Sequence, residues 1–322
     1  MTEPSRVIES DRLAEMIEGL LGAQPPDDAS VLRAAIDGVL ASTPSKEVDL
    51  FLGRIETTGQ TWGYHPPDPL ARRLSRAILR AILSPGSRLH DAGHLERIDG
   101  PCVLLGNHLG FADANLIEHL IAEAGDTEIP ERITTLVGPK VFVQPVRRFA
   151  SLCFGALKLP QSSTRASEEA VMPPREVARL ASDAIRIARE RLDAGDHLLI
   201  FIEGTRSRTG QMQSALAGVA RYLSTPGVQV LPFGIWGSEE FAQMEDDGIH
   251  RALVQARVGP PVPAEELLSR CNRKRPLVMD VVGFLVAGLL PVGYRGLYGE
   301  NPRETLASAQ RIAAELRSGG PG

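Results

Sequence analysis

The sequence predicts an α/β fold, in which helices cover a β-sheet, preceded by a small helical N-terminal region. From residue 93 onward, short apolar runs of strand length alternate with helical stretches, a pattern typical of a sheet with helices on its faces. Before residue 57, apolar residues recur at helical spacing. Hydrophobic residues make up 43% of the 322 residues and charged residues 23%, as in ordinary globular proteins.

The N-terminal region is expected to contain three helices, over residues 7–22, 29–42 and 46–55. A Pro-Pro-Asp-Asp stretch at residues 25–28 favours a turn between the first two. The region ends in a Gly- and Pro-rich segment, residues 57–69, which is the best candidate for a linker. We therefore expect residues 1–66 to form a helical region and linker.

Residues 70–89 have the pattern of a basic amphipathic helix and contain no acidic residue. Apolar residues line one side, and the other side carries four arginines: Arg72, Arg73, Arg76 and Arg80. Such a helix can lie on an anionic membrane surface. The alternative is a helix docked on the protein core with solvated arginines.

A second apolar segment lies between Pro276 and Pro291. Its fourteen residues fall short of the roughly 20 that span a bilayer, so they predict a buried or interfacial helix. Together with residues 70–89, this segment suggests reversible, peripheral attachment to an anionic membrane surface.

Strands of the α/β region are expected over residues 101–106, 133–138, 155–160, 197–202, 228–235 and 252–258. Helices are expected between them, near residues 111–124, 145–153, 174–194 and 213–224. The helix at residues 174–194 is the clearest, because Pro173 and Pro174 suit a helix start and Gly195 suits a stop.

The bulk composition excludes some classes of protein. A formal net charge of −5 and a pI of about 5.9 argue against nucleic-acid binding by the chain as a whole. The three cysteines are too widely spaced for a metal motif and favour a reducing compartment. Residues 1–12 lack the apolar core of a secretory signal. We expect a cytoplasmic protein, peripheral on the cytoplasmic membrane face, without a bound metal.

The first candidate for chemistry is the segment GNHLGFADANL, residues 106–116, in which an apolar strand leads into His108 and Asp113. The loop between them can bring the imidazole and the carboxylate together. A carboxylate bonded to one ring nitrogen leaves the other free to accept a proton, as a general base must. A loop histidine beside a helix-capping aspartate is the alternative.

The second candidate is FIEGTRSRTG, residues 201–210, which follows an apolar strand. Charged and hydroxyl side chains crowd onto a Gly-containing turn, where arginines and backbone amides can bind phosphate. A position at a strand end is typical of ligand sites in open α/β sheets. A solvated basic turn is the alternative.

Together, these segments resemble the glycerolipid acyltransferases. NHLGFAD is similar to the family's NHxxxxD block, and FIEGTRSR is similar to its FPEGTRSR block, with Ile202 in place of the usual proline. VQVLPFGIWG, residues 228–237, resembles a third block with a fixed proline, here Pro232. The resemblance implies a central mixed sheet flanked by helices, an acyltransferase domain over residues 67–310 and a C-terminal tail over residues 311–322.

The resemblance also implies a mechanism and a set of site residues. His108, oriented by Asp113, takes the proton of an acceptor hydroxyl, which attacks the thioester of acyl-CoA or acyl-carrier protein directly. Backbone amides near residue 111 are candidates to stabilise the oxyanion. No cofactor is expected beyond this co-substrate. The expected acceptor- and phosphate-binding residues are Glu203, Gly204, Thr205, Arg206, Ser207 and Arg208.

One block departs from the family's pattern. The stretch GALKLPQSSTR, residues 155–165, has Gln161 where the family has an arginine that helps to hold the acceptor. Lys158 or Arg165 can supply the missing charge, so both are candidate phosphate ligands.

The acceptor remains open between glycerol-3-phosphate and 1-acylglycerol-3-phosphate in phospholipid biosynthesis. The 95 positions from His108 to Glu203 and the helical N-terminal region favour glycerol-3-phosphate slightly, whereas EGTRSR and LPFGIWG are more like the lysophosphatidate branch. Two other classes of function remain as alternatives: a non-catalytic lipid- or membrane-binding protein with the same fold, and an acyl-thioester hydrolase.

Overall fold

The computed structural model describes residues 17–19, 21, 24–125, 128–160, 172–243, 248–300 and 302–318. The chain forms two compact units, each assembled from discontinuous segments. Unit 1 comprises Met1–Pro85, Thr135–Ala184 and Glu240–Ala252. Unit 2 comprises Gly86–Thr134, Ile185–Glu239 and Leu253–Gly322. Three of the five boundaries fall inside an element, namely β4 (Ile133–Val137), α7 (Pro174–Asp193) and α8 (Ser238–Phe241).

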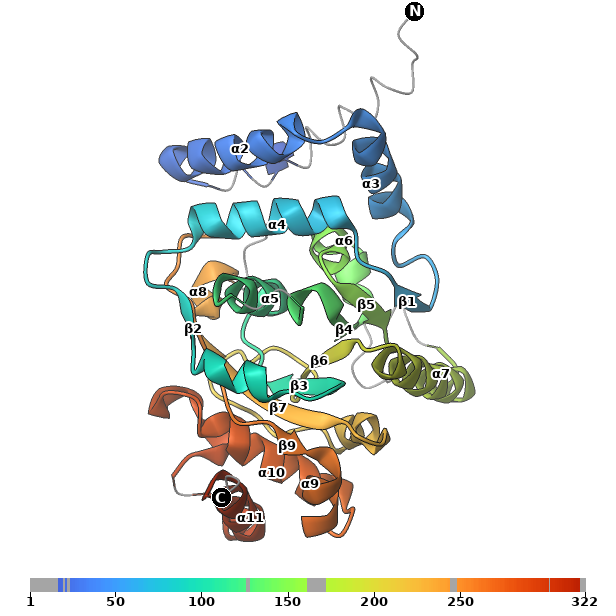
Figure 1. Cartoon of the computed structure of the whole chain (residues 1–322), viewed down its shortest axis with the longest axis vertical. Helices are drawn as coiled ribbons and strands as arrows, with labels where there is room; N and C mark the ends of the chain where they lie inside the picture. Colours follow the sequence, from blue (N-terminus) through green and yellow to red (C-terminus); the bar gives the residue numbers. More distant parts are fainter. Residues whose placement is uncertain are drawn as a thin grey trace, which may run out of the picture. The chain divides into compact units, whose positions relative to one another are not determined.

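Unit 1 is mainly helical. Its helices are α2 (Pro26–Ala41), α3 (Ser45–Thr57), α4 (Pro69–Ile82), η3 (Pro139–Phe142) and α6 (Pro145–Leu152). Helix α4 packs against α2, α3 and α6 (Figure 1). Two short strands, β1 (Gly63–His65) and β5 (Gly155–Lys158), pair antiparallel. The predicted helices at residues 29–42 and 46–55 are therefore confirmed as α2 and α3, whereas residues 7–22 lie mostly outside the described residues.

The arginine side of α4 is not a free basic face. Arg72 is buried, and its Nε donates a hydrogen bond to the Cys153 carbonyl at 2.9 Å. Arg73 forms an ion pair with Glu47 of α3 at 2.6 Å. The docked helix is therefore confirmed, since α4 packs against α2, α3 and α6. Arg73 and Arg80 remain exposed, so contact of α4 with a membrane surface stays a prediction.

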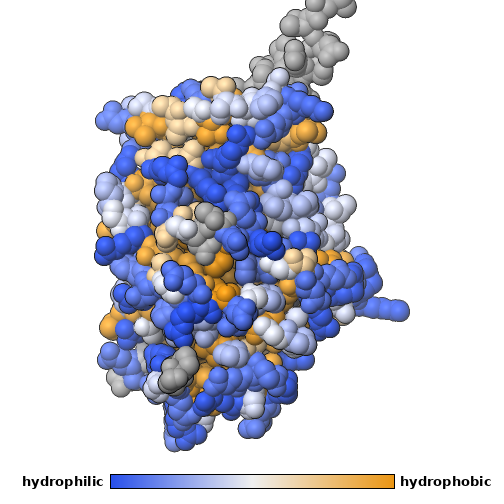
Figure 2. Space-filling view, viewed as in Figure 1, coloured by the Kyte–Doolittle hydropathy of each residue, from blue (hydrophilic) through white to orange (hydrophobic). Residues whose placement is uncertain are grey.

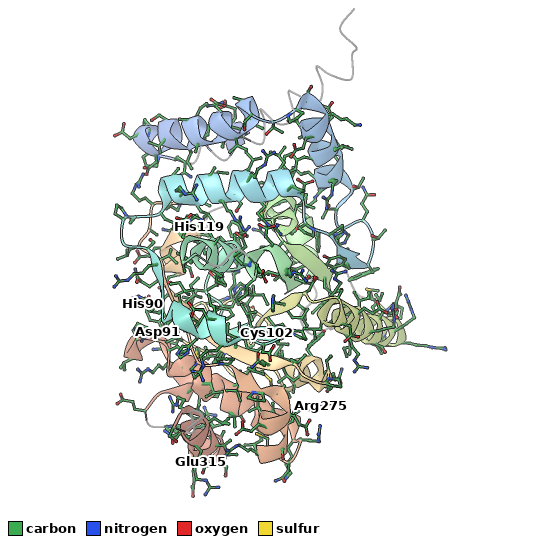
Figure 3. The ribbon with its side chains drawn as sticks, in the orientation of Figure 1. His90, Asp91, Cys102, His119, Arg275 and Glu315 are labelled. Carbon is green, nitrogen blue, oxygen red and sulfur yellow. The ribbon has the colours of Figure 1, made fainter. Side chains whose placement is uncertain are left out.

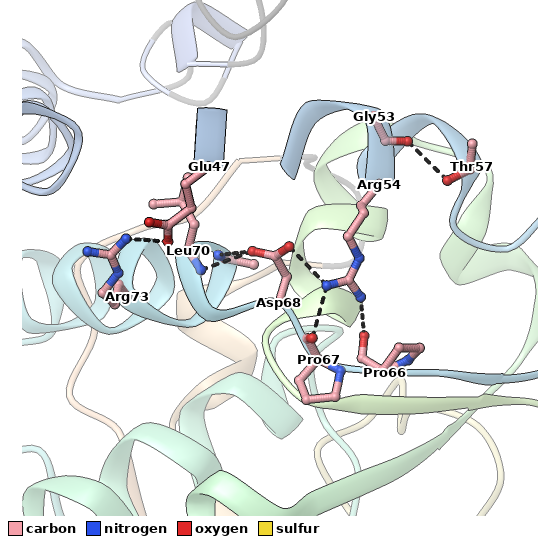
Figure 4. A network of polar contacts seen from close by, with 10 residues as sticks. Glu47, Gly53, Arg54, Thr57, Pro66, Pro67, Asp68, Leu70 and Arg73 are labelled. Carbon is pink, nitrogen blue, oxygen red and sulfur yellow. Dashed lines mark hydrogen bonds and ion pairs between the residues drawn. The ribbon is translucent and has the colours of Figure 1, made fainter. Parts of the chain in front are cut away.

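The segment expected to be a linker is tied to the helices around it (Figure 4). Arg54 of α3 donates to the Pro67 carbonyl at 3.0 Å, to Asp68 Oδ2 at 2.9 Å and to the Pro66 carbonyl. Asp68 Oδ1 in turn accepts from the amides of Leu70 and Ala71 and so caps α4. The expected boundary between residues 66 and 67 therefore falls within a hydrogen-bonded network.

Unit 2 contains a mixed sheet, as expected. Its strands are β2 (Arg88–His90), β3 (Cys102–Gly106), β6 (His197–Phe201), β7 (Gln229–Trp236), β8 (Gln255–Val258) and β9 (Val262–Pro263). They follow the order β6-β3-β7-β8-β2, with β9 also paired to β7. Strand β3 is entirely buried and runs parallel to both of its neighbours, while β7 and β8 are antiparallel. The predicted α/β fold is confirmed.

Pro232 occupies a position in β7 that tolerates proline. On one edge, β7 pairs with β9 through residues 229 and 230 and then with β8 from residue 233 onward. Pro232 lies in the gap between these two partners, where its missing N–H interrupts neither ladder. Its carbonyl accepts from the amide of Gly259 at 2.8 Å.

The helices of unit 2 are α5 (Asp113–Glu123), η5 (Ala217–Ser224), α9 (Ala264–Arg270), α10 (Arg275–Ala287) and α11 (Ala307–Ser318). Shorter turns are η1 (Ala92–Arg97), η2 (Pro130–Arg132), η6 (Val292–Tyr294), η7 (Gly296–Tyr298) and η8 (Glu304–Leu306). Helix α10 contains the apolar segment and is buried along most of its length, so the interfacial alternative is wrong. None of the described helices is both long and apolar enough to span a bilayer.

Two sequence-based boundaries differ from the structure. Residues 311–318 belong to α11, which packs against α10 and buries Ala313, so the expected tail is partly helical. The helix expected at residues 213–224 begins only at Ala217. The preceding amides of Gln213, Ala215 and Leu216 donate to Glu203, to the Tyr298 hydroxyl and to the Ile202 carbonyl, so they do not form the hydrogen bonds of a helical turn.

Candidate active site

Strand β3 delivers Asn107 and His108 to the end of the unit 2 sheet. The side chain of Asn107 is buried and bonds the backbone of Ile235 twice, donating to its carbonyl at 2.8 Å and accepting from its amide at 2.9 Å. These bonds continue the β3–β7 pairing beyond its last pair, Gly106 and Phe233. Sequence reasoning overlooked this role, although a polar amide directly after a buried strand signals a backbone partner.

His108 and Asp113 contact each other, as their spacing predicts. The His108 Nδ1 atom lies 2.9 Å from Asp113 Oδ2. Asp113 is completely buried, whereas the His108 side chain is 18% exposed. With Nδ1–H donating to the carboxylate, Nε2 is the nitrogen that can accept a proton.

The Asp113 carboxylate is held by the same loop that carries the histidine. Its Oδ2 atom accepts from the amides of Leu109 at 2.7 Å and Gly110 at 3.0 Å, and Oδ1 lies 3.1 Å from the Gly110 nitrogen. Because these two amides bind Asp113, they cannot stabilise an oxyanion, so such donors must be sought elsewhere.

A stack of aromatic rings covers one face of the imidazole. Phe201, the last residue of β6, lies parallel to the His108 ring with 4.0 Å between centroids. Phe233 of β7 packs edge-on against Phe201 at 6.1 Å. A Cβ atom on Gly106 would lie 2.3 Å from the Phe233 ring, so glycine is required here. The stack restricts rotation of the imidazole and keeps its Nε2 edge in one direction.

Glu203 supports the histidine loop from the neighbouring turn. The side chain is buried, its Oε1 accepts from the His108 amide at 3.2 Å and its Oε2 accepts from the Gln213 amide at 2.8 Å. Burial raises the pKa of Glu203 to about 7, against the lowering effect of these two hydrogen bonds. An acidic side chain already occupied by backbone donors is poorly suited to bind a phosphate. Its position instead indicates that it orients the loop.

The turn after β6 separates into buried and exposed side chains. Ser207 is buried; its hydroxyl donates to the Gln211 carbonyl at 2.7 Å, and its amide donates to the His108 carbonyl at 2.8 Å. Gly204, Thr205 and Arg208 are exposed, and Arg206 is partly exposed. Residues 203 and 207 thus join the turn to the histidine loop by hydrogen bonds, while Gly204, Thr205 and Arg208 are exposed.

Lys158, one of the two residues expected to replace the missing arginine, already has partners in its own unit. Lys158 belongs to unit 1, where its ammonium donates to the Gly59 carbonyl at 2.6 Å and lies 4.4 Å from the centre of the Trp62 ring. Burial lowers the pKa of Lys158. Gln161 and Arg165 lie outside the described residues.

Other conspicuous side chains have partners that explain them. His90 stacks on Trp236 and bonds Gln255, with 2.6 Å between His90 Nε2 and the Gln255 amide oxygen. Asp91, which follows His90 at the end of β2 (Figure 3), pairs with Arg257 at 3.2 Å. Cys102 is buried in β3, and burial raises the pKa of its thiol. Among the described residues, no group of three or more acidic, histidine or cysteine side chains could hold a metal ion.

Three comparisons place these features among known proteins. Residues 87–236 match the family model described as Acyltransferase. The chloroplastic 1-acyl-sn-glycerol-3-phosphate acyltransferase of Arabidopsis thaliana is 22% identical over 220 residues, which cover 66% of this chain and 55% of that protein. The chain therefore spans little more than half of that relative. The 1-acyl-sn-glycerophosphate acyltransferase of Thermotoga maritima is a similar solved structure, with 18% identity, coverage of 77% and 83%, and a TM-score of 0.42.

Proposed function

We propose, from the match of residues 87–236 to the acyltransferase family model, that this chain transfers a fatty-acyl group from a thioester to a hydroxyl of 1-acylglycerol-3-phosphate. The observation that carries this proposal is the His108–Asp113 pair, in which a buried, multiply bonded carboxylate orients a partly exposed imidazole. This arrangement suits proton transfer to and from a hydroxyl and a thiol.

The reaction requires one proton to be taken and returned. His108 Nε2 removes the acceptor's hydroxyl proton as its oxygen attacks the thioester carbonyl carbon. The tetrahedral intermediate then expels the thiolate of CoA or of acyl-carrier protein, and His108 returns the proton to that sulfur. Asp113 stabilises the imidazolium between these steps, because its charge lies 2.9 Å from Nδ1. The acyl group passes directly between substrates, so no residue needs to be acylated.

The acceptor is proposed to carry a phosphate and one acyl chain. The sequence favoured glycerol-3-phosphate slightly, but the Arabidopsis relative is a 1-acyl-sn-glycerol-3-phosphate acyltransferase, which favours the acylated form. The partly exposed Arg206 and the exposed Arg208 of the turn can hold the phosphate.

For peripheral membrane attachment, we propose a surface other than α4 and α10. Residues 133–167 contain five cations, Lys140, Arg147, Arg148, Lys158 and Arg165, and no acidic residue. Val143 in this stretch is 69% exposed, and Lys140 beside it is also exposed. Polar residues dominate the face shown in Figure 2, with hydrophobic residues in patches between them. An exposed apolar residue among cations is suited to an anionic lipid surface.

Labelled acyl-CoA and a panel of acceptors test the proposed reaction. The panel contains glycerol-3-phosphate, 1-acylglycerol-3-phosphate, other lysophospholipids and a sample without acceptor. We expect label in a phospholipid product only with the 1-acyl acceptor. Free fatty acid in every sample would indicate a thioester hydrolase, and absence of any product would favour a non-catalytic lipid-binding protein.

Cosedimentation with anionic vesicles tests the membrane surface separately. Val143→Asp should reduce the bound fraction at low salt. Leu50→Asp is the matched control, because Leu50 is 61% exposed in the same unit but follows the acidic residues Glu47 and Asp49. Equal loss in both variants, or in neither, would contradict the assignment of this surface.

A further inference from the structure

The turn that follows β6 is held on its outer side by a segment that lies beyond the family match. Residues 292–299, here called the C-terminal strap, form η6 and η7 and come 56 positions after residue 236, where that match ends. The Met212 amide donates to the Tyr294 carbonyl at 2.9 Å, and the Leu297 amide donates to the Met212 carbonyl at 3.1 Å. The strap thus pairs with Met212 through both of its backbone groups.

Glycine makes this close approach possible. Gly296 has a φ of +47°, in the left-handed region that favours glycine. A Cβ atom at this position would lie 2.2 Å from the Met212 carbonyl oxygen and 2.8 Å from its nitrogen. Both contacts are with backbone, so neither can be relieved by rotation of a side chain.

Tyr298 fixes a second point of the turn. Its buried hydroxyl accepts from the Ala215 amide at 3.0 Å and donates to Asp280 Oδ1 at 3.1 Å. Burial raises the pKa of Tyr298, so the hydroxyl keeps its proton for Asp280. The ring lies against Gly283 of α10, where a Cβ atom would come within 2.4 Å of it. Tyr298 is therefore held in one orientation by α10.

Hydrogen bonds connect the residues held by the strap to the loop that carries His108. Gln213 lies between the two held residues, Met212 and Ala215, and its amide donates to Glu203. Glu203 accepts from the His108 amide with its other oxygen. The strap therefore fixes one side of the turn, and Glu203 and Ser207 fix the other, so that the exposed residues Gly204, Thr205 and Arg208 start from a single conformation.

We propose that the C-terminal strap positions this turn for the acceptor, with Tyr298 as a positioning residue of the site. The proposal rests on the proposed acyl transfer and adds to it a residue outside the matched region. A preorganised turn binds its ligand without a loss of conformational entropy, whereas a loosened turn must be ordered at binding. Loss of the strap contacts should therefore weaken acceptor use more than donor use.

Tyr298→Phe is the central test, because it removes the hydroxyl and keeps the ring. We expect the acceptor KM to rise about 3- to 10-fold, the range for one lost hydrogen bond, with donor KM changed less than twofold. Tyr222→Phe is the matched control, since it removes another largely buried hydroxyl of unit 2 away from the strap. Asp280→Asn should stay close to wild type, because its amide oxygen can still accept from Tyr298.

Hydrogen exchange of the peptide covering residues 204–216 gives a readout that does not depend on activity. Tyr298→Phe and Gly296→Ala should both speed its exchange, whereas Tyr222→Phe should not. Faster exchange with an unchanged acceptor KM would overturn the positioning role, and so would a KM rise shared equally with Tyr222→Phe. Should the wild-type protein lack acyl transfer, the proposed function fails, while unchanged exchange would show that the strap itself does not hold the turn.

Discussion

Two buried aspartates, Asp68 in unit 1 and Asp113 in unit 2, accept similar hydrogen bonds from the backbone but pair with different side chains. Each accepts hydrogen bonds from two successive backbone amides beside a helix N-terminus, Leu70 and Ala71 for Asp68, and Leu109 and Gly110 for Asp113. The cation at Asp68 is Arg54, which is permanently charged. The side chain at Asp113 is His108, an imidazole that bonds the carboxylate through one ring nitrogen and has a second ring nitrogen for proton transfer.

The comparison shows how the same backbone arrangement serves structure or chemistry. With arginine, the carboxylate closes a network that ties the segment before α4 to α3. With histidine, the carboxylate fixes the tautomer and orientation of a base whose other nitrogen remains available. The aspartate that is paired with a histidine, Asp113, therefore marks the candidate active site. The five predictions below test this distinction, in order of decreasing effect.

Replacing His108 should have the largest effect on kcat. His108→Ala removes the proposed base and should lower kcat about 10²- to 10⁴-fold, as is typical for loss of general base catalysis. The fold should persist, because His108 is a partly exposed loop residue. Steady-state kinetics with circular dichroism checks both points. Retention of more than about a tenth of the wild-type rate would exclude His108 as the base.

Asp113→Asn should also be severe, with a fall in kcat of about 10²-fold or more. The amide cannot offset the imidazolium charge, and its NH₂ group would face backbone donors that now bind Asp113. The comparison is Asp68→Asn, which should leave kcat within about twofold. Equal losses of kcat in the two variants would indicate that both carboxylates act only through the fold.

Replacing a cation that binds substrate should change KM, unlike replacement of Arg54, whose partner is the Asp68 side chain. A charge-assisted contact to phosphate contributes about 1.5–3 kcal/mol, so Arg206→Ala should raise the acceptor KM roughly 10- to 150-fold. Donor KM should change much less.

The same measurement on Arg208→Ala, Lys158→Ala and Arg165→Ala asks which cation replaces the arginine absent at Gln161. Lys158 is the least expected of these, because its ammonium already binds Gly59 and Trp62. If none of the four alanine variants changes acceptor KM beyond about twofold, a phosphorylated acceptor loses its physical basis.

Glu203 should make the free energy of unfolding depend on pH. Its pKa of about 7 in the folded protein lies above an ordinary value near 4.3, so the folded state binds more protons between these pH values. Stability from this group should therefore fall as pH rises from about 4.3 to 7, by on the order of 1–3 kcal/mol, and level off above.

Urea unfolding at pH 5 and pH 8 measures this change in wild type and in Glu203→Gln. The variant should lose much of the difference, although it is also less stable, because one amide oxygen cannot accept from both His108 and Gln213. An unchanged difference between the two pH values would assign it to other groups.

The smallest effect is expected at the structural aspartate. Asp68→Ala removes the cap of α4 and leaves Arg54 without its carboxylate, which should cost about 0.5–2 kcal/mol of stability. Thermal unfolding should show a lower Tm, and kcat/KM below that Tm should stay near wild type. A large fall in kcat/KM at a temperature where the variant is folded would contradict the assignment of a purely structural role to Asp68.

The sequence was sufficient for features that depend on local spacing. The alternation of strands and helices, and the contact between His108 and Asp113 five positions apart, are both confirmed. It was insufficient where the role of a side chain depends on a partner far away in the sequence. Arg72 looks solvated in its own helix, but its partner is the Cys153 carbonyl 81 positions away. Glu203 looks like a ligand residue, but it binds the amides of His108 and Gln213.

The network around Arg54 limits how the protein can be divided. A truncated chain beginning at residue 67 would lack Arg54 and Glu47, the partners of Asp68 and Arg73. It would also uncover the surface of α4 that α2 and α3 bury, placing leucines and isoleucines in water. Such a fragment should be poorly soluble even though it contains the whole of residues 87–236, so α2 and α3 are not expected to be a removable appendage.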